Sequence, residues 1–324
     1  MNKPFYIFLF VFILSTFQYK SSFAQTNLVY NGDFEIYDTC PFNPSTPGDL
    51  QIEHCLGWTA PRKLGTSDYF NVCNNFGTGL AGVPQNLIGF QYPYNGNGYC
   101  GIIAWNIGLT NGQNYREYLQ TKLLQPLISG ENYHFSFYVS YYGVNYSLEK
   151  LGALFSVNDY NSNSCIPIVA TPQIVNQNGF ITDSLGWTKI EGDFFANGGE
   201  TFLTIGYFED SLTVSDTLNT HNEPLVYYDS YYFVDGVELI QKDIDIANIF
   251  SPNGDEINDY FYFEFPFTKT SIFNRWGIKV FETNKSNVFW DGRTTSGNES
   301  VDGTYYYIIE TKSNIFKGFI QLLR

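Results

Sequence analysis

The last quarter of the chain begins with Asn248-Ile-Phe-Ser-Pro-Asn-Gly-Asp-Glu-Ile-Asn-Asp259 and continues through Ile272-Phe-Asn-Arg-Trp-Gly-Ile-Lys-Val-Phe281. Three further blocks follow: Trp290-Asp-Gly292, Asp302-Gly-Thr-Tyr-Tyr-Tyr307 and Lys317-Gly-Phe-Ile-Gln-Leu-Leu-Arg324. The Pro-Asn-Gly-Asp and Asp-Gly pairs supply residues that tight turns need. Between them, β-branched and aromatic residues favour strands. This part of the chain is therefore predicted to consist of short strands joined by turns.

These five blocks, in this order, resemble the gliding-motility-associated C-terminal domain, the type-B sorting signal of the type IX secretion system. The resemblance implies a small immunoglobulin-like β-sandwich at residues 242–324 that is bound by outer-membrane secretion machinery of Bacteroidota-type bacteria. An ending in Arg324 instead of Lys departs from the type-A signals and supports type B. The alternative is an ordinary sandwich that happens to come last.

The residues of these blocks that are predicted to form the sorting signal, for its folding or its recognition, are Asn253, Gly254, Asp255, Asn258, Asp259, Arg275, Trp276, Gly277, Trp290, Asp291, Gly292, Gly303, Tyr305, Gly318 and Arg324.

The first segment has the features of a secretory signal peptide. Lys3 precedes an apolar run over residues 5–14, and Ser22-Phe-Ala24 places small residues before Gln25. We therefore predict a signal peptide at residues 1–24, and the absence of Cys at position 25 argues against a lipid anchor. No later stretch is apolar for long enough to cross a bilayer. The mature chain is expected to be secreted or held on the outer cell surface, without a transmembrane segment.

Charge is distributed unevenly. The formal net charge is −15, and residues 25–247 hold 23 acidic against 7 basic residues, whereas residues 248–324 hold 9 against 8. An acidic front part repels phosphate backbones, so nucleic acid is excluded as a partner. Aromatic residues make up 19% of the chain and charged residues only 15%, and no long helical periodicity is present. This composition predicts an all-β chain.

Residues 25–241 are predicted to form an antiparallel jelly-roll β-sandwich of about eight strands. A short strand with a turn residue inside it is expected at residues 27–35. Long loops rich in Pro, Gly and Asn fill most of residues 37–98, with one strand near Trp58. The regular strands are expected at residues 99–105, 116–123, 133–140, 152–157, 187–195, 200–208 and 226–240.

The chain has five cysteines, which oxidise readily in an exported protein. No Cys-x-x-Cys pair is present, which argues against a zinc site. Sequence alone does not fix the connectivity; our prediction pairs Cys40 with Cys55 and Cys73 with Cys100, and leaves Cys165 free.

Three segments of the front part resemble the first and last strands of galactose-binding-like jelly rolls, the fold of many carbohydrate-binding modules. They are Asn31-Gly-Asp-Phe-Glu35, Gly57-Trp58 and Tyr232-Phe-Val-Asp-Gly-Val-Glu-Leu239. The resemblance implies that the terminal strands are neighbours and that they hold a structural Ca²⁺. Asp235 lies in phase with core residues of its strand, where a carboxylate needs a partner or a metal.

We therefore predict that Glu35 and Asp235 bind Ca²⁺ together with backbone carbonyls. The alternative is that Asp235 accepts hydrogen bonds from turn amides at the end of its strand. A second acidic segment, residues 253–259, has an oxygen spacing similar to calcium loops but lacks their closing Glu. We interpret it as a turn with weak calcium affinity at most.

Tyrosines beside amide side chains suit the binding of sugars, because a ring stacks on the apolar C–H face of a sugar while polar groups bind its hydroxyls. The alternative is that tyrosine simply fills both faces of extracellular sheets. The predicted ligand-binding residues are Tyr92, Tyr94, Tyr99, Tyr141 and Tyr142.

No catalytic motif is present: the three histidines are scattered and there is no Gly-x-Ser-x-Gly elbow. The sequence thus predicts a non-enzymatic, exported protein with a glycan-binding jelly roll and a C-terminal type IX sorting signal. Two alternatives remain. One is a structural or adhesive surface protein that binds protein partners, and the other is a glycan-degrading enzyme with paired carboxylates.

Overall fold

The computed structural model describes residues 26–74, 79–106, 114–142, 146–209, 217–219, 229–244, 246–312 and 314–324. The predicted signal peptide, residues 1–24, lies outside these ranges. Within them the only helix is one 3-10 turn, η1 (Gln51–His54), and all other regular elements are strands. No helix in this described part is long and apolar enough to span a membrane. The prediction of an all-β chain is confirmed.

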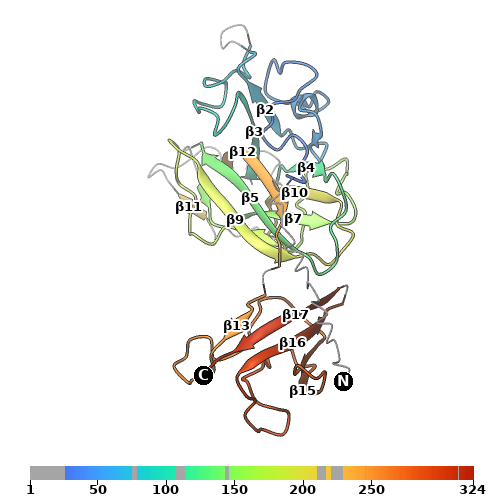
Figure 1. Ribbon diagram of the computed structural model, residues 1–324. Coiled ribbons are helices and arrows are strands. Elements are labelled where there is room, and N and C mark those ends of the chain that lie inside the picture. The colour runs from blue at the N-terminus through green and yellow to red at the C-terminus, as the bar shows by residue number, and fades with distance from the viewer. Residues whose placement is uncertain are drawn as a thin grey trace, which may run out of the picture.

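Two five-stranded antiparallel sheets form the front part of the molecule, at the top of Figure 1. The first has the order β1-β4-β10-β7-β8, with strands at Trp58–Thr59, Leu119–Lys122, Phe202–Tyr207, Leu151–Ser156 and Ile174–Val175. The second has the order β2-β3-β12-β5-β9, with strands at Asp68–Asn71, Gly98–Asn106, Asp229–Gln241, Asn132–Tyr141 and Thr188–Phe195. A small pair, β6 (Tyr146–Leu148) and β11 (Thr217–Asn219), completes this part.

The two large sheets enclose one hydrophobic core, as expected of a sandwich. Phe155 of β7 packs against Phe135 of β5 and Phe194 of β9, with ring centroids 5.2 and 4.5 Å apart. Both partners come from the opposite sheet. Successive side chains of a strand point to opposite faces of the sheet, so Phe135, Phe137 and Val139 share one face of β5. All three are completely buried in this core.

A second, smaller apolar cluster covers part of the outer face of the β2-β3-β12-β5-β9 sheet. It contains Phe70, Tyr99 and Phe233, and residues of the segment before β3 such as Ile88 pack against it. The segment thus covers strands β2, β3 and β12 on their outer side. On the neighbouring strands β5 and β9, side chains such as Tyr138 and Lys189 remain partly exposed.

The predicted strand at residues 27–35 is not formed. Val29 makes a single bridge to Leu123, and Asn31 and Phe34 then take positive φ angles of 53° and 56°. The Asn31 side chain forms the hydrogen bonds that strand pairing would otherwise supply to Ile36. Its Oδ1 accepts the N–H of Ile36 at 2.8 Å, and its Nδ2 donates to the Ile36 carbonyl at 2.8 Å. This local turn directs the chain so that Glu35 reaches the segment before β3.

The disulfide joins Cys40 to Cys73, with an S–S distance of 2.05 Å. Both predicted pairs, Cys40–Cys55 and Cys73–Cys100, are therefore wrong. Sequence alone does not fix connectivity, and the fold places Cys55 and Cys100, completely buried, in the sandwich core, away from the Cys40–Cys73 bond. Cys165 forms no disulfide in the structure.

The C-terminal part contains a five-stranded sheet of order β13-β17-β16-β14-β15, shown in orange to red in Figure 1. Its strands lie at Ile249–Phe250, Ile315–Leu322, Gly303–Glu310, Lys269–Phe273 and Lys279–Thr283. Tyr305, Tyr307 and Ile309 point from β16 into a second core. The opposite layer is irregular and supplies four phenylalanines, at positions 261, 263, 265 and 267.

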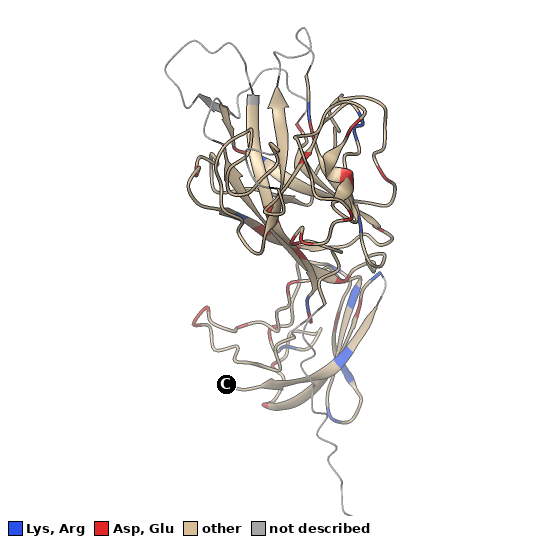
Figure 2. Cartoon of the chain, turned by 90° about the horizontal axis from the view of Figure 1, so that it is seen from above, with Lys and Arg blue, Asp and Glu red and all other residues tan. Residues whose placement is uncertain are grey.

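The two parts touch near the end of β12. Phe195 of β9 packs partly against the C-terminal core, and Asn314 Nδ2 donates to Glu131 Oε1 at 3.1 Å. Strands of the C-terminal sheet carry basic residues, among them Lys279 in β15 and Lys317 in β17. Figure 2 shows basic segments in blue on this sheet. Each part has its own hydrophobic cluster. The domain boundary at residues 241 and 242 stays a prediction.

Candidate functional site

Asp235 of β12 anchors the start of the segment 92–98, which we call the anchored loop. Its Oδ2 accepts the backbone N–H groups of Tyr94 and Asn95 at 2.9 and 3.2 Å, and its Oδ1 accepts that of Gly236 at 2.6 Å. Asp235 is completely buried. Burial raises its pKa to about 8, although the three N–H donors act in the opposite direction.

Glu35 anchors the end of the same loop. Its Oε1 accepts the N–H groups of Asn97 and Gly98 at 2.6 and 2.9 Å, and its Oε2 accepts Asn97 Nδ2 at 2.9 Å. Gly96 between them has a φ of +69°, and a Cβ there would lie 2.4 Å from the Glu35 carboxyl group. The two predicted metal ligands therefore act on one loop, from segments 200 residues apart in sequence.

The anchored loop presents aromatic rings at the surface. Tyr94 stacks on Tyr138 of β5, with ring centroids 3.6 Å apart and an interplanar angle of 16°. Trp187 Nε1 donates to the carbonyl of Tyr92 at 3.0 Å, and its ring meets Tyr94 edge-on at 6.5 Å. Tyr92 and Tyr94 are 63% and 45% exposed, so both have surface available to a ligand.

Gly236 makes the stacked pair possible. It lies where the pairing of β12 with β5 is interrupted by a register shift, and it has a φ of +60°. A Cβ at this position would lie 2.9 Å from Tyr94 Cδ1 and 3.0 Å from Tyr138 Cδ2. Any larger residue would therefore have to move one of the two rings.

Three of the five predicted ligand-binding tyrosines do not share this surface. Tyr99 is completely buried and donates its hydroxyl to the Gln91 carbonyl at 3.1 Å. Tyr141 is 3% exposed and packs against Tyr232 in the core. Tyr142 is half-buried against the smaller cluster. The prediction that Tyr99 and Tyr141 offer a ring face to a ligand is therefore wrong. The alternative, that these tyrosines only pack against the sheets, holds for both.

Sequence reasoning missed Tyr138 and Trp187. Tyr138 carried a signal, because it shares the outward face of β5 with His134 and Ser136 and is an aromatic residue in a polar phase. Trp187 carried none, since it precedes β9 and meets the anchored loop only through the fold.

A cavity of about 380 Å³ borders the stacked tyrosines. It is lined on one side by the turn at residues 31–33 and on the other by Ser136, Tyr138 and Lys189. Lys189 Nζ lies 5.9 Å from the centre of the Tyr138 ring and pairs with Glu191 at 2.7 Å. The cavity thus combines ring surface with a hydroxyl, an ammonium and backbone groups. The other polar side chains of its lining are Asn27, Asn31, Asp33, Asn95 and Glu238.

The contacts of Asp235 match the alternative to calcium binding, namely hydrogen bonds from turn amides, and Glu35 accepts hydrogen bonds of the same kind. Calcium takes six to eight oxygen ligands, and here the carboxylate oxygens already face N–H donors. Over the described ranges no group of three or more His, Cys, Asp or Glu residues lies close enough to hold a metal ion. The observed donors fit loop anchoring, and calcium binding stays a prediction.

Asp235→Ala tests both roles. The change removes the acceptor of three backbone N–H groups, so we expect the free energy of unfolding to fall by about 1–3 kcal/mol. The melting temperature of the full chain should then fall both with and without EDTA. If a calcium ion binds only to the folded chain, EDTA would also lower the melting temperature of the parent protein, but not that of Asp235→Ala. If EDTA leaves the parent's melting temperature unchanged and elemental analysis finds no metal, the calcium prediction is wrong.

Asp68 and Glu117 are two buried, neighbouring carboxyls that line a surface cavity of about 310 Å³. Burial raises the pKa of both groups, and the charge of Glu117 adds to the effect on Asp68. Asp68 accepts the Tyr231 hydroxyl at 2.6 Å and Glu117 accepts the Tyr115 hydroxyl at 2.6 Å. Internal donors therefore occupy both carboxyls, an arrangement that suits a structural pair.

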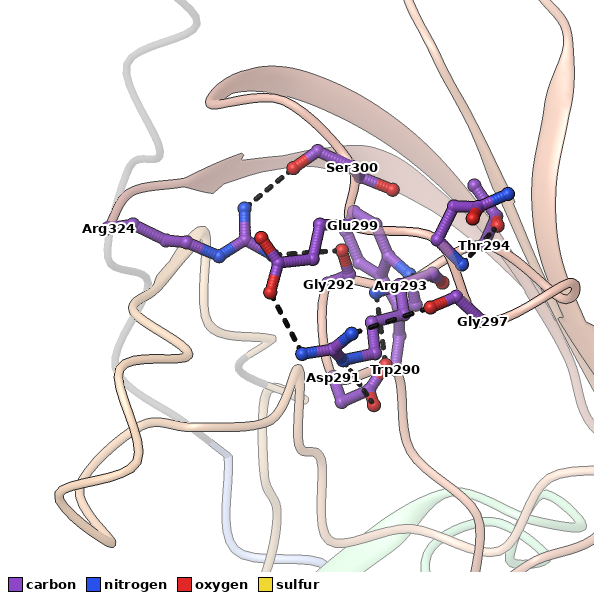
Figure 3. A network of polar contacts seen from close by, with 10 residues as sticks. Trp290, Asp291, Gly292, Arg293, Thr294, Gly297, Glu299, Ser300 and Arg324 are labelled. Carbon is purple, nitrogen blue, oxygen red and sulfur yellow. Dashed lines mark hydrogen bonds and ion pairs between the residues drawn. The ribbon is translucent and has the colours of Figure 1, made fainter.

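In the C-terminal part, the predicted signal residues fall into a packed set, which lies in or against the C-terminal core and its turns, and an exposed set. Trp290 is 1% exposed and packs on Phe250 and Tyr305, with ring centroids 5.2 and 4.8 Å away. Arg324 closes the turn that follows Trp290, because its guanidinium donates to the carbonyls of Ser300 and Gly292 at 2.6 and 3.1 Å. Figure 3 shows this network, in which the end of the chain is held against the turn.

Glycines of the packed set have steric roles. Gly292 has a φ of +78°, and a Cβ would lie 3.0 Å from Arg324 Nη2. A Cβ on Gly318 would lie 2.3 Å from the Tyr307 hydroxyl. Gly303, with a φ of +143°, faces the Arg275 guanidinium. These glycines allow close packing of the sheet edge and its turns.

The exposed set lies in two turns. Trp276 is 72% exposed at the tip of the β14–β15 hairpin, where Arg275 lies 5.4 Å from its ring and Gly277 has a φ of +76°. In the turn at residues 253–259, Asp259 accepts the N–H groups of Gly254 and Glu256 at 2.7 and 2.9 Å. The Asp259 carboxylate therefore serves the turn itself, as interpreted from the sequence. Weak calcium binding there stays a prediction.

Residues 244–322 match the family of the CHU_C type IX secretion signal domain. The matched range contains the whole C-terminal sheet. This part of the chain is therefore a type IX secretion signal, and the protein is exported to the cell surface or secreted. The resemblance stated from the sequence is confirmed. A comparison with curated protein sequences found no match.

Several solved structures are similar to the chain. The K1 cleaved adhesin domain of Lys-gingipain from Porphyromonas gingivalis W83 has 16% identity and a TM-score of 0.27, with 58% of this chain and 92% of that one covered. The CBM22-1–GH10 modules of xylanase 10B from Clostridium thermocellum have 14% identity and a TM-score of 0.30. That match covers 67% of this chain and 32% of the other, so the chain spans about a third of it. Similarities with such low identities and TM-scores do not assign a function to the chain.

Proposed function

We propose that this exported protein binds glycans without modifying them, and that the anchored loop is its binding surface. One observation supports this proposal above the others: Tyr92 and Tyr94 are exposed on a loop whose two ends are fixed by buried or hydrogen-bonded carboxylates. A rigid aromatic surface binds with a smaller entropic cost than one that must be ordered by its ligand.

The chemistry of the surroundings suits a sugar. Sugars present apolar C–H faces and hydroxyl groups, and the site offers the ring of Tyr94 beside the polar cavity and the exposed ring of Tyr92 on the same loop. Ser136, Lys189 and Glu238 line that cavity and supply both hydrogen-bond donors and acceptors. A ligand seated there would stack on a ring and bond to these groups at the same time.

Alanine substitution of the exposed rings tests the site. The full chain is applied to a glycan array, and the affinity for the best glycan is then measured by titration. Tyr92→Ala or Tyr94→Ala is expected to weaken binding about 5- to 150-fold, since a stacked ring contributes about 1–3 kcal/mol. Tyr260→Ala is the matched control, because Tyr260 is 57% exposed but belongs to the C-terminal part.

Unchanged affinity in both loop variants would place the glycan site elsewhere. An array without any bound glycan would instead favour the alternative of a surface protein with protein partners. Release of reducing sugars from the bound glycan would contradict the non-catalytic part of the proposal. In that case Asp68→Asn and Glu117→Gln identify whether the buried acid pair is responsible, because both variants keep similar hydrogen-bonding side chains.

A further inference from the structure

Two cysteines outside the Cys40–Cys73 bond lie against each other. Cys55 follows η1 and Cys100 is in β3, and both are completely buried in the sandwich core. The Cys100 thiol is within hydrogen-bonding contact of the Cys55 sulfur. They are thus a pair of thiols in contact, not two isolated ones.

The neighbouring residues place this pair independently. Cys55 forms a bridge with Tyr37, and Cys100 is paired with Tyr69 of β2. The rings of Tyr37 and Tyr69 are themselves neighbours, with centroids 6.3 Å apart. Asn31 Nδ2 also donates to Cys55 Sγ at 3.3 Å, which fixes the position of that sulfur.

The protein is also exported, and exported proteins pass through oxidising compartments where buried cysteine pairs form disulfides. The same part of the chain already contains one disulfide, between Cys40 and Cys73. We propose that Cys55 and Cys100 form a second disulfide in the exported protein, which links the loop after η1 to the central strand β3.

The chemistry is thiol–disulfide exchange with a protein disulfide of the export route. One thiolate attacks that disulfide and forms a mixed disulfide, and the second thiolate then displaces the carrier, which leaves as a dithiol. Two protons and two electrons pass from the cysteine pair to the carrier. Burial raises the pKa of the Cys100 thiol and hides it from the carrier, so the exchange takes place before the sandwich closes.

With this bond, the disulfides would overlap along the chain, since Cys55 lies between Cys40 and Cys73 while Cys100 lies beyond them. The two loops would then restrain each other and the end of the anchored loop, because residue 98 lies close to Cys100 at the start of β3. The front part would have more resistance to unfolding than the Cys40–Cys73 bond alone provides.

The thiol count of the exported full chain tests the proposal. The protein is unfolded without reductant, alkylated with iodoacetamide and weighed by mass spectrometry. We expect one alkylated cysteine, Cys165, and a cross-linked peptide that contains Cys55 and Cys100. Three alkylated cysteines, which correspond to Cys55, Cys100 and Cys165, would overturn the proposal. A cross-link of Cys55 or Cys100 to any other cysteine would overturn it equally.

Two variants control the count. Cys165→Ser is expected to leave no alkylated cysteine, since its only change is at the free position. Cys100→Ser is expected to expose Cys55 to alkylation along with Cys165 when the unfolded chain is treated. A failure of Cys100→Ser to fold does not affect the test, because the parent chain and Cys165→Ser decide it by themselves.

Discussion

Removal of residues 248–324 is expected to abolish export and to leave a folded front part inside the outer membrane. Residues 244–322 match a type IX secretion signal, and a signal peptide by itself crosses only the inner membrane. The front part has its own hydrophobic core, to which the C-terminal sheet contributes no residue. Export is therefore expected to be lost without loss of the front fold.

Cell fractionation and immunoblotting in a host with a type IX system measure this effect. The full chain is the positive control, and protease resistance of the shortened chain checks that its front part is folded. The converse experiment attaches residues 248–324 to an unrelated periplasmic reporter, of which a fraction should reach the outside. Shortened protein that reaches the medium as efficiently as the full chain would contradict the prediction.

Trp290→Ala is expected to unfold the C-terminal part and to reduce export strongly. The substitution removes a ring that is 1% exposed between Phe250 and Tyr305, and such changes cost about 3–5 kcal/mol. It also removes the hydrogen bond from Trp290 Nε1 to the Arg293 carbonyl at 2.7 Å. In thermal unfolding of the full chain, the C-terminal part of the variant is expected to unfold in a separate transition at lower temperature. Cell fractionation measures its export.

Trp276→Ala is the matched substitution, because the same residue type lies 72% exposed in the same part of the chain. Its effect on stability is expected to stay within about 0.5 kcal/mol. Its export is nevertheless expected to fall, since an exposed ring at a hairpin tip is available to the secretion machinery. If Trp276→Ala is exported like the parent, Trp276 is not a recognition residue. If Trp290→Ala is as stable as the parent, the packing argument is wrong.

The strands of the front part followed from periodicity where the alternation was strong. The strand expected at residues 133–140 is observed at Asn132–Tyr141, and that expected at residues 99–105 at Gly98–Asn106. The segment 27–35 failed because a polar side chain, that of Asn31, replaces strand pairing with local hydrogen bonds. Strand propensities do not predict where a side chain takes over the backbone hydrogen bonds of a neighbouring strand.

The candidate site was predictable only in part, for the same kind of reason. The importance of Asp235 followed from a carboxylate placed among core residues, and that of Glu35 from the resemblance of the terminal strands to galactose-binding-like jelly rolls. Their shared loop did not follow, because residues 94–98 meet them only in three dimensions. Tyr99 has the same residue type and the same neighbourhood in sequence as Tyr94, yet it is buried. The difference depends on which face of β3 the preceding segment covers, and that is a property of the assembled sheet.

Gly236 gives a criterion for examining other sequences. In any chain with the same pair of stacked rings, the position after the anchoring aspartate has to remain without a side chain, because a Cβ would press on Tyr94 and Tyr138 together. A related chain with alanine or serine at that position is expected to lack one of the two aromatic residues. Co-variation of the three positions across relatives would thus separate chains that keep this surface from chains that retain only the scaffold.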